Sequence, residues 1–233
     1  MEMKVACCDE KQDRFALVYM QIASELSKRF GMGGRGVVRD SIRGLAKEMG
    51  LKRRSFLIEN GLKPNLKNLF TKGGPAPCGL RCDKEWIKVS AQEVFVNVSK
   101  CPYADVWNKE GEPEIGKMFC EEYYPEYVHW AASDKAQIDT ARELVNEGDN
   151  FCRHSFYLRP ANLDPKARQE IFEEFDLSYH YPDKEFPVEG SNYDEMLEIL
   201  LSEFVGNSSK WLDEEGCTLL KELVGQYQNT GKE

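Results

Sequence analysis

Apolar residues recur every three or four positions over the first 60 residues, which is the spacing of helices with one buried face. In the first such stretch they are Phe15, Val18, Tyr19, Ile22, Leu26 and Phe30. The glycine-rich run GMGGRG at 31–36 is typical of a helix end and turn. The pattern therefore predicts one helix over 9–30 and a second over 37–49, and we expect two shorter helices between residues 54 and 70.

The period changes to two after residue 85, which indicates strands with one buried face. Val94, Val96 and Val98 occupy alternate positions, and 86–89 is a candidate hairpin partner for that strand. The turn signal EGDN at 147–150 separates two further segments, which we interpret as a second hairpin. On the strand after that turn, Cys152, His154 and Phe156 share one face.

Helical spacing returns around this sheet and after it. The expected helices cover 102–107, 114–124, 164–175, 193–205 and 209–228. Helices first, then an antiparallel sheet with an embedded helix, then helices again predict an α+β fold rather than a doubly wound sheet. We expect an N-terminal helical region over 1–75, a cysteine-containing α+β region over 76–160 and a C-terminal helical region over 161–233, together forming one compact domain.

Composition and charge exclude several classes of protein. The chain has 233 residues, with 31 basic and 40 acidic side chains and a net charge of −9, which argues against nucleic-acid binding. It has no run of 18 apolar residues, so no membrane-spanning helix is expected. Its first ten residues lack the apolar core of a signal peptide, which predicts a cytoplasmic location.

Basic residues concentrate between positions 29 and 54, where Arg39 and Arg43 lie one helical turn apart. Such a face is able to hold a carboxylate or a phosphate. The alternative is that these arginines form ion pairs with an acidic helix.

Eight cysteines are the most informative feature of the composition, because in a cytoplasmic chain they are thiols, metal ligands or nucleophiles more often than disulfides. They are Cys7, Cys8, Cys78, Cys82, Cys101, Cys120, Cys152 and Cys217. The pair Cys78 and Cys82 follows a Gly/Pro loop. Two thiolates at this spacing suit half of a metal or cluster site, or a redox role, although loop thiols without a role have the same spacing.

A second set of cysteines lies at element boundaries. Cys101, Cys120 and Cys152 each begin or end a different predicted element, so the fold is able to bring them together in one pocket. Cys101 precedes a helix start, where the helix dipole favours a thiolate. The alternative is three small buried side chains without chemistry.

Three motifs in this set resemble the L-2-amino-thiazoline-4-carboxylic acid hydrolase family. They are Cys-Pro-x2-Asp at 101–105, Gly-x2-Phe-Cys at 116–120 and Gly-Asp-x2-Cys-x-His-x-Phe at 148–156. The helix with Arg39-x3-Arg43-Gly44 is similar to the upstream region of the same family, and the resemblance covers roughly 15–158. The pattern is also similar to vinyl-reductase-type small-molecule-binding domains, which are regarded as ligand sensors.

The resemblance implies hydrolysis of a cyclic C–N bond in a small thiazoline or amidine that carries a carboxylate. In one mechanism Cys101, Cys120 and Cys152, with or without His154, hold a divalent metal, zinc or manganese, that lowers the pKa of bound water to about 7. In the other, a thiolate attacks directly and His154 acts as general base.

The candidate catalytic residues are accordingly Cys101, His154 and Asp105, and the candidate substrate-binding residues are Arg39, Arg43 and Tyr124, with the arginines holding the carboxylate. The alternative function is a non-catalytic protein that binds a small molecule, a metal or an iron–sulfur cluster through the same cysteines, as a sensor or a redox protein.

Overall fold

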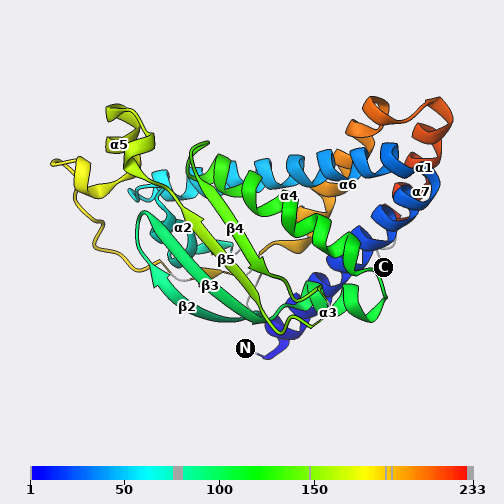
Figure 1. Ribbon diagram of the computed structural model, residues 1–233, viewed down its shortest axis with the longest axis horizontal. Coiled ribbons are helices and arrows are strands. Elements are labelled where there is room, and N and C mark those ends of the chain that lie inside the picture. Colours follow the sequence, from blue (N-terminus) through cyan, green and yellow to red (C-terminus); the bar gives the residue numbers. More distant parts are fainter. Residues whose placement is uncertain (1, 76–80, 147, 187, 190, 230–233) are drawn as a thin grey trace. The chain divides into compact units, whose positions relative to one another are not determined.

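The computed structural model describes residues 2–75, 81–146, 148–186, 188–189 and 191–229 (Figure 1). Its helices and its four-stranded antiparallel sheet confirm the predicted α+β class. The chain forms two compact units, each assembled from stretches that are separated in sequence. The first consists of Met1–Leu45, Pro102–Tyr123 and Asn192–Glu233, and the second of Ala46–Cys101 and Tyr124–Ser191. In the described stretches, no helix combines the length and the apolar character needed to cross a membrane.

The longest element, α1 (Glu2–Glu59), consists of two helical segments that meet at a kink in the glycine run. Gly31 adopts φ 55° and ψ −122°, a left-handed backbone that favours glycine. Helical structure resumes directly after it, and the buried stripe continues through Val38 and Ile42. The predicted helix end at the glycine run is therefore confirmed at Gly31, but the predicted turn over 31–36 is too long, because helical structure resumes directly after this one residue.

Aromatic side chains form the core of the first unit. Tyr19 and Trp107 are fully buried, with ring centroids 5.8 Å apart. Their polar atoms are satisfied by backbone: Tyr19 Oη donates to the Ile115 carbonyl at 2.8 Å, and Trp107 Nε1 donates to the Ala16 carbonyl at 3.1 Å. These bonds fix α3 (Pro102–Lys109) and the first part of α4 (Pro113–Ala131) on α1.

Two long helices complete the first unit. They are α6 (Tyr193–Trp211) and α7 (Glu214–Asn229), which pack on each other. The predicted boundary between residues 205 and 209 is wrong. The helix continues to Trp211 and ends at Leu212, and Asp213 accepts a hydrogen bond from the Gly216 amide at the start of α7.

The second unit is organised around a sheet with the strand order β2-β3-β5-β4, which Figure 1 shows side by side. The strands are β2 (Asp83–Val89), β3 (Glu93–Lys100), β4 (Gln137–Arg142) and β5 (Cys152–Tyr157). Both predicted hairpins are confirmed, since β2 pairs antiparallel with β3 and β4 with β5. The central strand β5 therefore has neighbours on both sides.

Shorter elements surround this sheet. They are α2 (Leu66–Thr71), α5 (Pro165–Ile171), 3-10 turns at Pro160–Asn162 and Glu173–Phe175, and a parallel pair of β1 (Gly74–Pro75) with β6 (Val188–Glu189). Phe70 of α2 packs on Phe156 of β5 with ring centroids 4.5 Å apart. This contact places α2 on the face of the sheet that carries the buried valines of β3.

We expect Gly34→Ala to destabilise the protein, because a Cβ at this position would overlap the carbonyl oxygen of Leu26 across the kink. The expected loss is about 2 kcal/mol of unfolding free energy, the cost typical of a forced backbone shift, measured by chemical denaturation. Gly206→Ala in α6 is the matched control. No atom lies within 4 Å of its Cβ position, so alanine there should raise stability by up to about 1 kcal/mol. A Gly34→Ala protein as stable as wild type would contradict the kink.

Candidate functional site

Cys152 and His154 are neighbours on the covered face of β5, as the strand period predicted. Cys152 is 8% exposed and His154 is 5% exposed. In the register of β5 with β3, Cys152 lies opposite Val98 and His154 opposite Val96, so both side chains adjoin apolar ones. A thiol and an imidazole are thus held two residues apart in an environment from which water is largely excluded.

The sulfur of Cys152 accepts a hydrogen bond from the backbone amide of Leu144, with an N to S distance of 3.1 Å. An N–H group that donates to sulfur stabilises a thiolate more than a thiol. The connection between β4 and β5 therefore closes the hairpin and also places a backbone hydrogen-bond donor next to the sulfur of Cys152.

Asp149 holds that connection in shape. Its Oδ2 accepts a hydrogen bond from the Glu143 amide at 3.1 Å, and Gly148 adopts φ 87°, which favours glycine. Folding the loop back in this way places the next amide, that of Leu144, on the sulfur. In the sequence, Asp149 was identified only as part of the motif at 148–156. In the structure, its carboxylate accepts the Glu143 amide and so fixes the shape of the loop.

His154 is held as a neutral imidazole. Burial lowers its pKa from the ordinary value of 6.5 to about 4. Its Nδ1 lies 3.2 Å from Thr140 Oγ1 on the neighbouring strand, which leaves Nε2 as the second ring nitrogen. The ring of Tyr124, a predicted substrate-binding residue, lies 5.0 Å from the imidazole between centroids, so the structure brings these two predicted residues together.

Two more cysteines come to the same end of the sheet. Cys101 directly follows Lys100, the last residue of β3, and Cys82 directly precedes Asp83, which pairs with Lys100. Both are partly exposed, and Cys152 begins β5 at this end. The predicted partner of Cys82, Cys78, lies outside the described residues.

The remaining predicted residues of the thiol site belong to the first unit. Cys120 lies on α4 and is partly exposed. Burial raises the pKa of Tyr19 well above its ordinary range, and the charges of Cys120 and Glu122 raise this pKa further. Asp105 lies on the exposed side of α3. Convergence of Cys120 with Cys101 and Cys152, and a catalytic role for Asp105, stay predictions.

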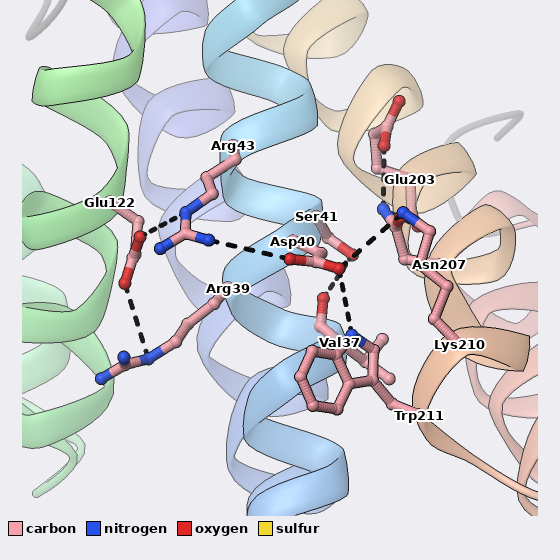
Figure 2. Close-up of polar contacts among 10 residues, drawn as sticks. All are labelled: Val37, Arg39, Asp40, Ser41, Arg43, Glu122, Glu203, Asn207, Lys210 and Trp211. Carbon is pink, nitrogen blue, oxygen red and sulfur yellow. Dashed lines mark hydrogen bonds and ion pairs between the residues drawn. The ribbon is translucent and has the colours of Figure 1, made fainter.

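Arg39 and Arg43 share one carboxylate in the first unit (Figure 2). Arg43 Nε bonds Glu122 Oε2 at 2.6 Å, and Arg39 Nε lies 3.5 Å from Glu122 Oε1. The Glu122 side chain is only 10% exposed, so its carboxylate is largely shielded from water. The structure therefore contains the ion pairs with an acidic helix that the sequence left as an alternative.

A cavity of about 280 Å³ adjoins these arginines. Its lining residues are Met32, Arg35, Gly36, Arg39, Asp40, Arg43 and Trp211. Trp211, at the end of α6, donates from Nε1 to Asp40 Oδ2 at 3.0 Å, as Figure 2 shows. Sequence reasoning missed Trp211, and the only available signal was the glycine run: a Cβ at Gly36 would overlap the indole ring.

A divalent metal needs several ligands at one point. Within the described ranges, no group of three or more His, Cys, Asp or Glu side chains is placed to hold a metal ion. A divalent metal held by Cys101, Cys120 and Cys152 stays a prediction, because Cys120 belongs to one unit and the other two cysteines to the second.

The family model described as L-2-amino-thiazoline-4-carboxylic acid hydrolase matches residues 11–156 of the chain. No curated protein matches the chain, and no solved structure matches it either. The matched region includes Arg39 and Arg43 on α1 and β5 up to Phe156, and it ends before α6 and Trp211.

We expect the stability of the protein to fall between pH 6.5 and pH 4 because of His154. The unfolded chain binds a proton near pH 6.5, whereas folded His154 binds one only near pH 4. The stabilisation is therefore fully present above pH 6.5 and is lost as the pH falls toward 4, at up to about 1.4 kcal/mol per pH unit. Chemical denaturation at pH 7.5 and pH 5 measures the loss, and His154→Gln should show a smaller one. An equal loss in both proteins would contradict a neutral buried imidazole.

Proposed function

The chain belongs to the L-2-amino-thiazoline-4-carboxylic acid hydrolase family, and we propose that it opens a C–N bond at the amidine carbon of a small cyclic carboxylate with Cys152 as nucleophile. Family membership supports a hydrolase-type function broadly. The observation that carries the finer proposal is the pairing, on one covered strand face, of a sulfur that accepts a backbone N–H with a neutral imidazole.

The reaction begins with attack of the Cys152 sulfur on the amidine carbon. A C–S bond forms, and the thiol proton passes to Nε2 of His154 as the general base. Because His154 has a low pKa, the imidazolium formed is a strong acid. It returns the proton to the ring nitrogen, and the C–N bond breaks.

Water completes the cycle. It attacks the same carbon, gives a proton to His154, and displaces Cys152, whose sulfur recovers a proton from the imidazolium. One water is consumed, the ring is opened and both residues return to their initial state. Among the described thiols, Cys152 is preferred as nucleophile to Cys101 because it shares the covered face with His154.

Thr140 and Tyr124 position the base. The hydrogen bond between Thr140 Oγ1 and Nδ1 fixes the plane of the imidazole, and Tyr124 covers one side of it. For His154 to act as a base through Nε2, Nδ1 carries the proton and donates to Thr140 Oγ1. Tyr124 is also the candidate substrate contact in this unit, since its ring adjoins the base.

Cys152→Ser should lower turnover of 2-amino-thiazoline-4-carboxylate by roughly a thousandfold, since it removes the nucleophile, and His154→Gln by roughly a hundredfold, since it removes the base. Cys217→Ser is the matched control. That thiol on α7 lies 3.8 Å from the Leu212 carbonyl in the first unit, and its loss should leave turnover unchanged.

Two results would overturn this assignment. One is a large loss of turnover in Cys101→Ser with little change in Cys152→Ser. The other is stoichiometric zinc, manganese or iron in the wild-type protein that is lost with Cys152, which would make this cysteine a ligand. Iron with sulfide would favour the cluster-binding alternative.

A further inference from the structure

We propose that Cys82 and Cys101 form a redox-active pair, which a small-molecule disulfide oxidises to a reversible disulfide bond between the ends of β2 and β3. Both cysteines belong to the second unit. The sequence pattern groups Cys82 with Cys78, and Cys101 with Cys120 and Cys152, so only the strand register brings this pair together. The inference does not rest on the proposed reaction.

The two cysteines lie opposite each other at the open end of the β2–β3 hairpin. Asp83 pairs with Lys100 at the last position of this ladder, and Cys82 and Cys101 are the next residues outward on the two strands. Directly opposite residues of an antiparallel pair have Cα atoms about 4.5 to 5.5 Å apart. Disulfides span Cα separations of about 4.4 to 6.8 Å. One further step of the register therefore places the two cysteines at a separation that a disulfide spans.

A bulge in β3 selects which residue lies opposite Cys82. Ser99 is the extra residue, because its neighbours Val98 and Lys100 pair with consecutive residues of β2. If the pairing continued without this bulge, Lys100 would lie opposite Cys82. With the bulge, Cys101 takes that position. Opposite side chains of an antiparallel pair project from the same face and interact, so the two thiols meet on one side of the sheet.

Both residues of the pair reach the surface, where a dissolved oxidant is able to contact them. Cys82 and Cys101 are partly exposed, whereas Cys152 at the same end of the sheet is 8% exposed. Cys101 also immediately precedes α3. The amide groups and the dipole at a helix start favour the thiolate, which is the form that attacks a disulfide. We therefore assign the first attack to Cys101.

Two exchange steps form the bond, with oxidised glutathione as the small-molecule disulfide. The Cys101 thiolate attacks one glutathione sulfur, a mixed disulfide forms, and one glutathione thiolate leaves. The Cys82 thiolate then attacks the Cys101 sulfur and displaces the second glutathione. Two protein thiols are oxidised and one small-molecule disulfide is reduced. The two protons of the protein thiols end on the two released glutathione molecules.

The new bond joins an edge strand to its neighbour. In the described part of the chain β2 stands first in the order β2-β3-β5-β4, so its pairing is with β3. Weakly held strand ends open locally at low cost in free energy. A covalent bond between Cys82 and Cys101 closes this end, and oxidation therefore acts as a switch that suppresses the opening of β2.

Treatment of the full-length protein with oxidised glutathione, followed by alkylation, digestion without reduction and mass spectrometry, tests the pair. We expect one cross-linked species that joins the Cys82 and Cys101 peptides, with the summed mass less two hydrogen atoms. Dithiothreitol should reverse it. Hydrogen exchange of the β2 amides should slow by about threefold or more in the oxidised protein.

Two variants distinguish the pair from unspecific modification. Cys82→Ser removes the second thiol, so a mixed disulfide of Cys101 with glutathione should accumulate. Cys217→Ser is the matched control, since this partly exposed thiol lies on α7 in the first unit, and its loss should leave the yield of the cross-link unchanged. Glutathione adducts on the wild-type protein without the cross-link, or a cross-link of Cys82 to another cysteine in its place, would overturn the proposal.

Discussion

The antiparallel pairing of β5 with two neighbours is the constraint on which the chemistry of the second unit depends. Because side chains alternate along a strand, a shift of one residue in this register would move Cys152 and His154 to the opposite face. Pairing on both sides, with β3 and β4, prevents that shift. The covered face then holds a thiol and an imidazole among valines and aromatic rings, where both interact more strongly with their few polar partners than they would in water.

Burial favours the neutral form of an ionisable group, and at one of the two side chains the backbone adds a hydrogen-bond donor. Burial lowers the pKa of His154 and keeps the imidazole neutral, which suits a base that must accept a proton. The Leu144 amide donates a hydrogen bond to the Cys152 sulfur, and such a donor interacts more strongly with a thiolate than with a thiol. Gly148 and Asp149 shape the loop that supplies this amide. Their spacing before the cysteine therefore has a structural cause.

The sequence predicted the local parts of this arrangement well. Alternating valines and the EGDN turn identified both hairpins and the shared face of Cys152 and His154, because period and turn chemistry are local properties. The glycine run correctly marked the end of the first helical segment, but its turn is confined to Gly31, because one residue with positive φ suffices for the kink. Trp211 was missed because its contact with Gly36 joins residues far apart in the chain, and no periodicity identifies such a partner.

The proposed reaction requires that Cys152 becomes covalently attached to the substrate carbon. Rapid acid quench of the full-length protein during turnover of 2-amino-thiazoline-4-carboxylate, followed by peptide mapping by mass spectrometry, tests it directly. We expect a transient mass increase, equal to the mass of the ring-opened substrate, on the peptide that contains Cys152, and its rise and decay should have rates compatible with turnover. Turnover with no adduct on this peptide, or with an adduct on another cysteine alone, would show that Cys152 is not the nucleophile.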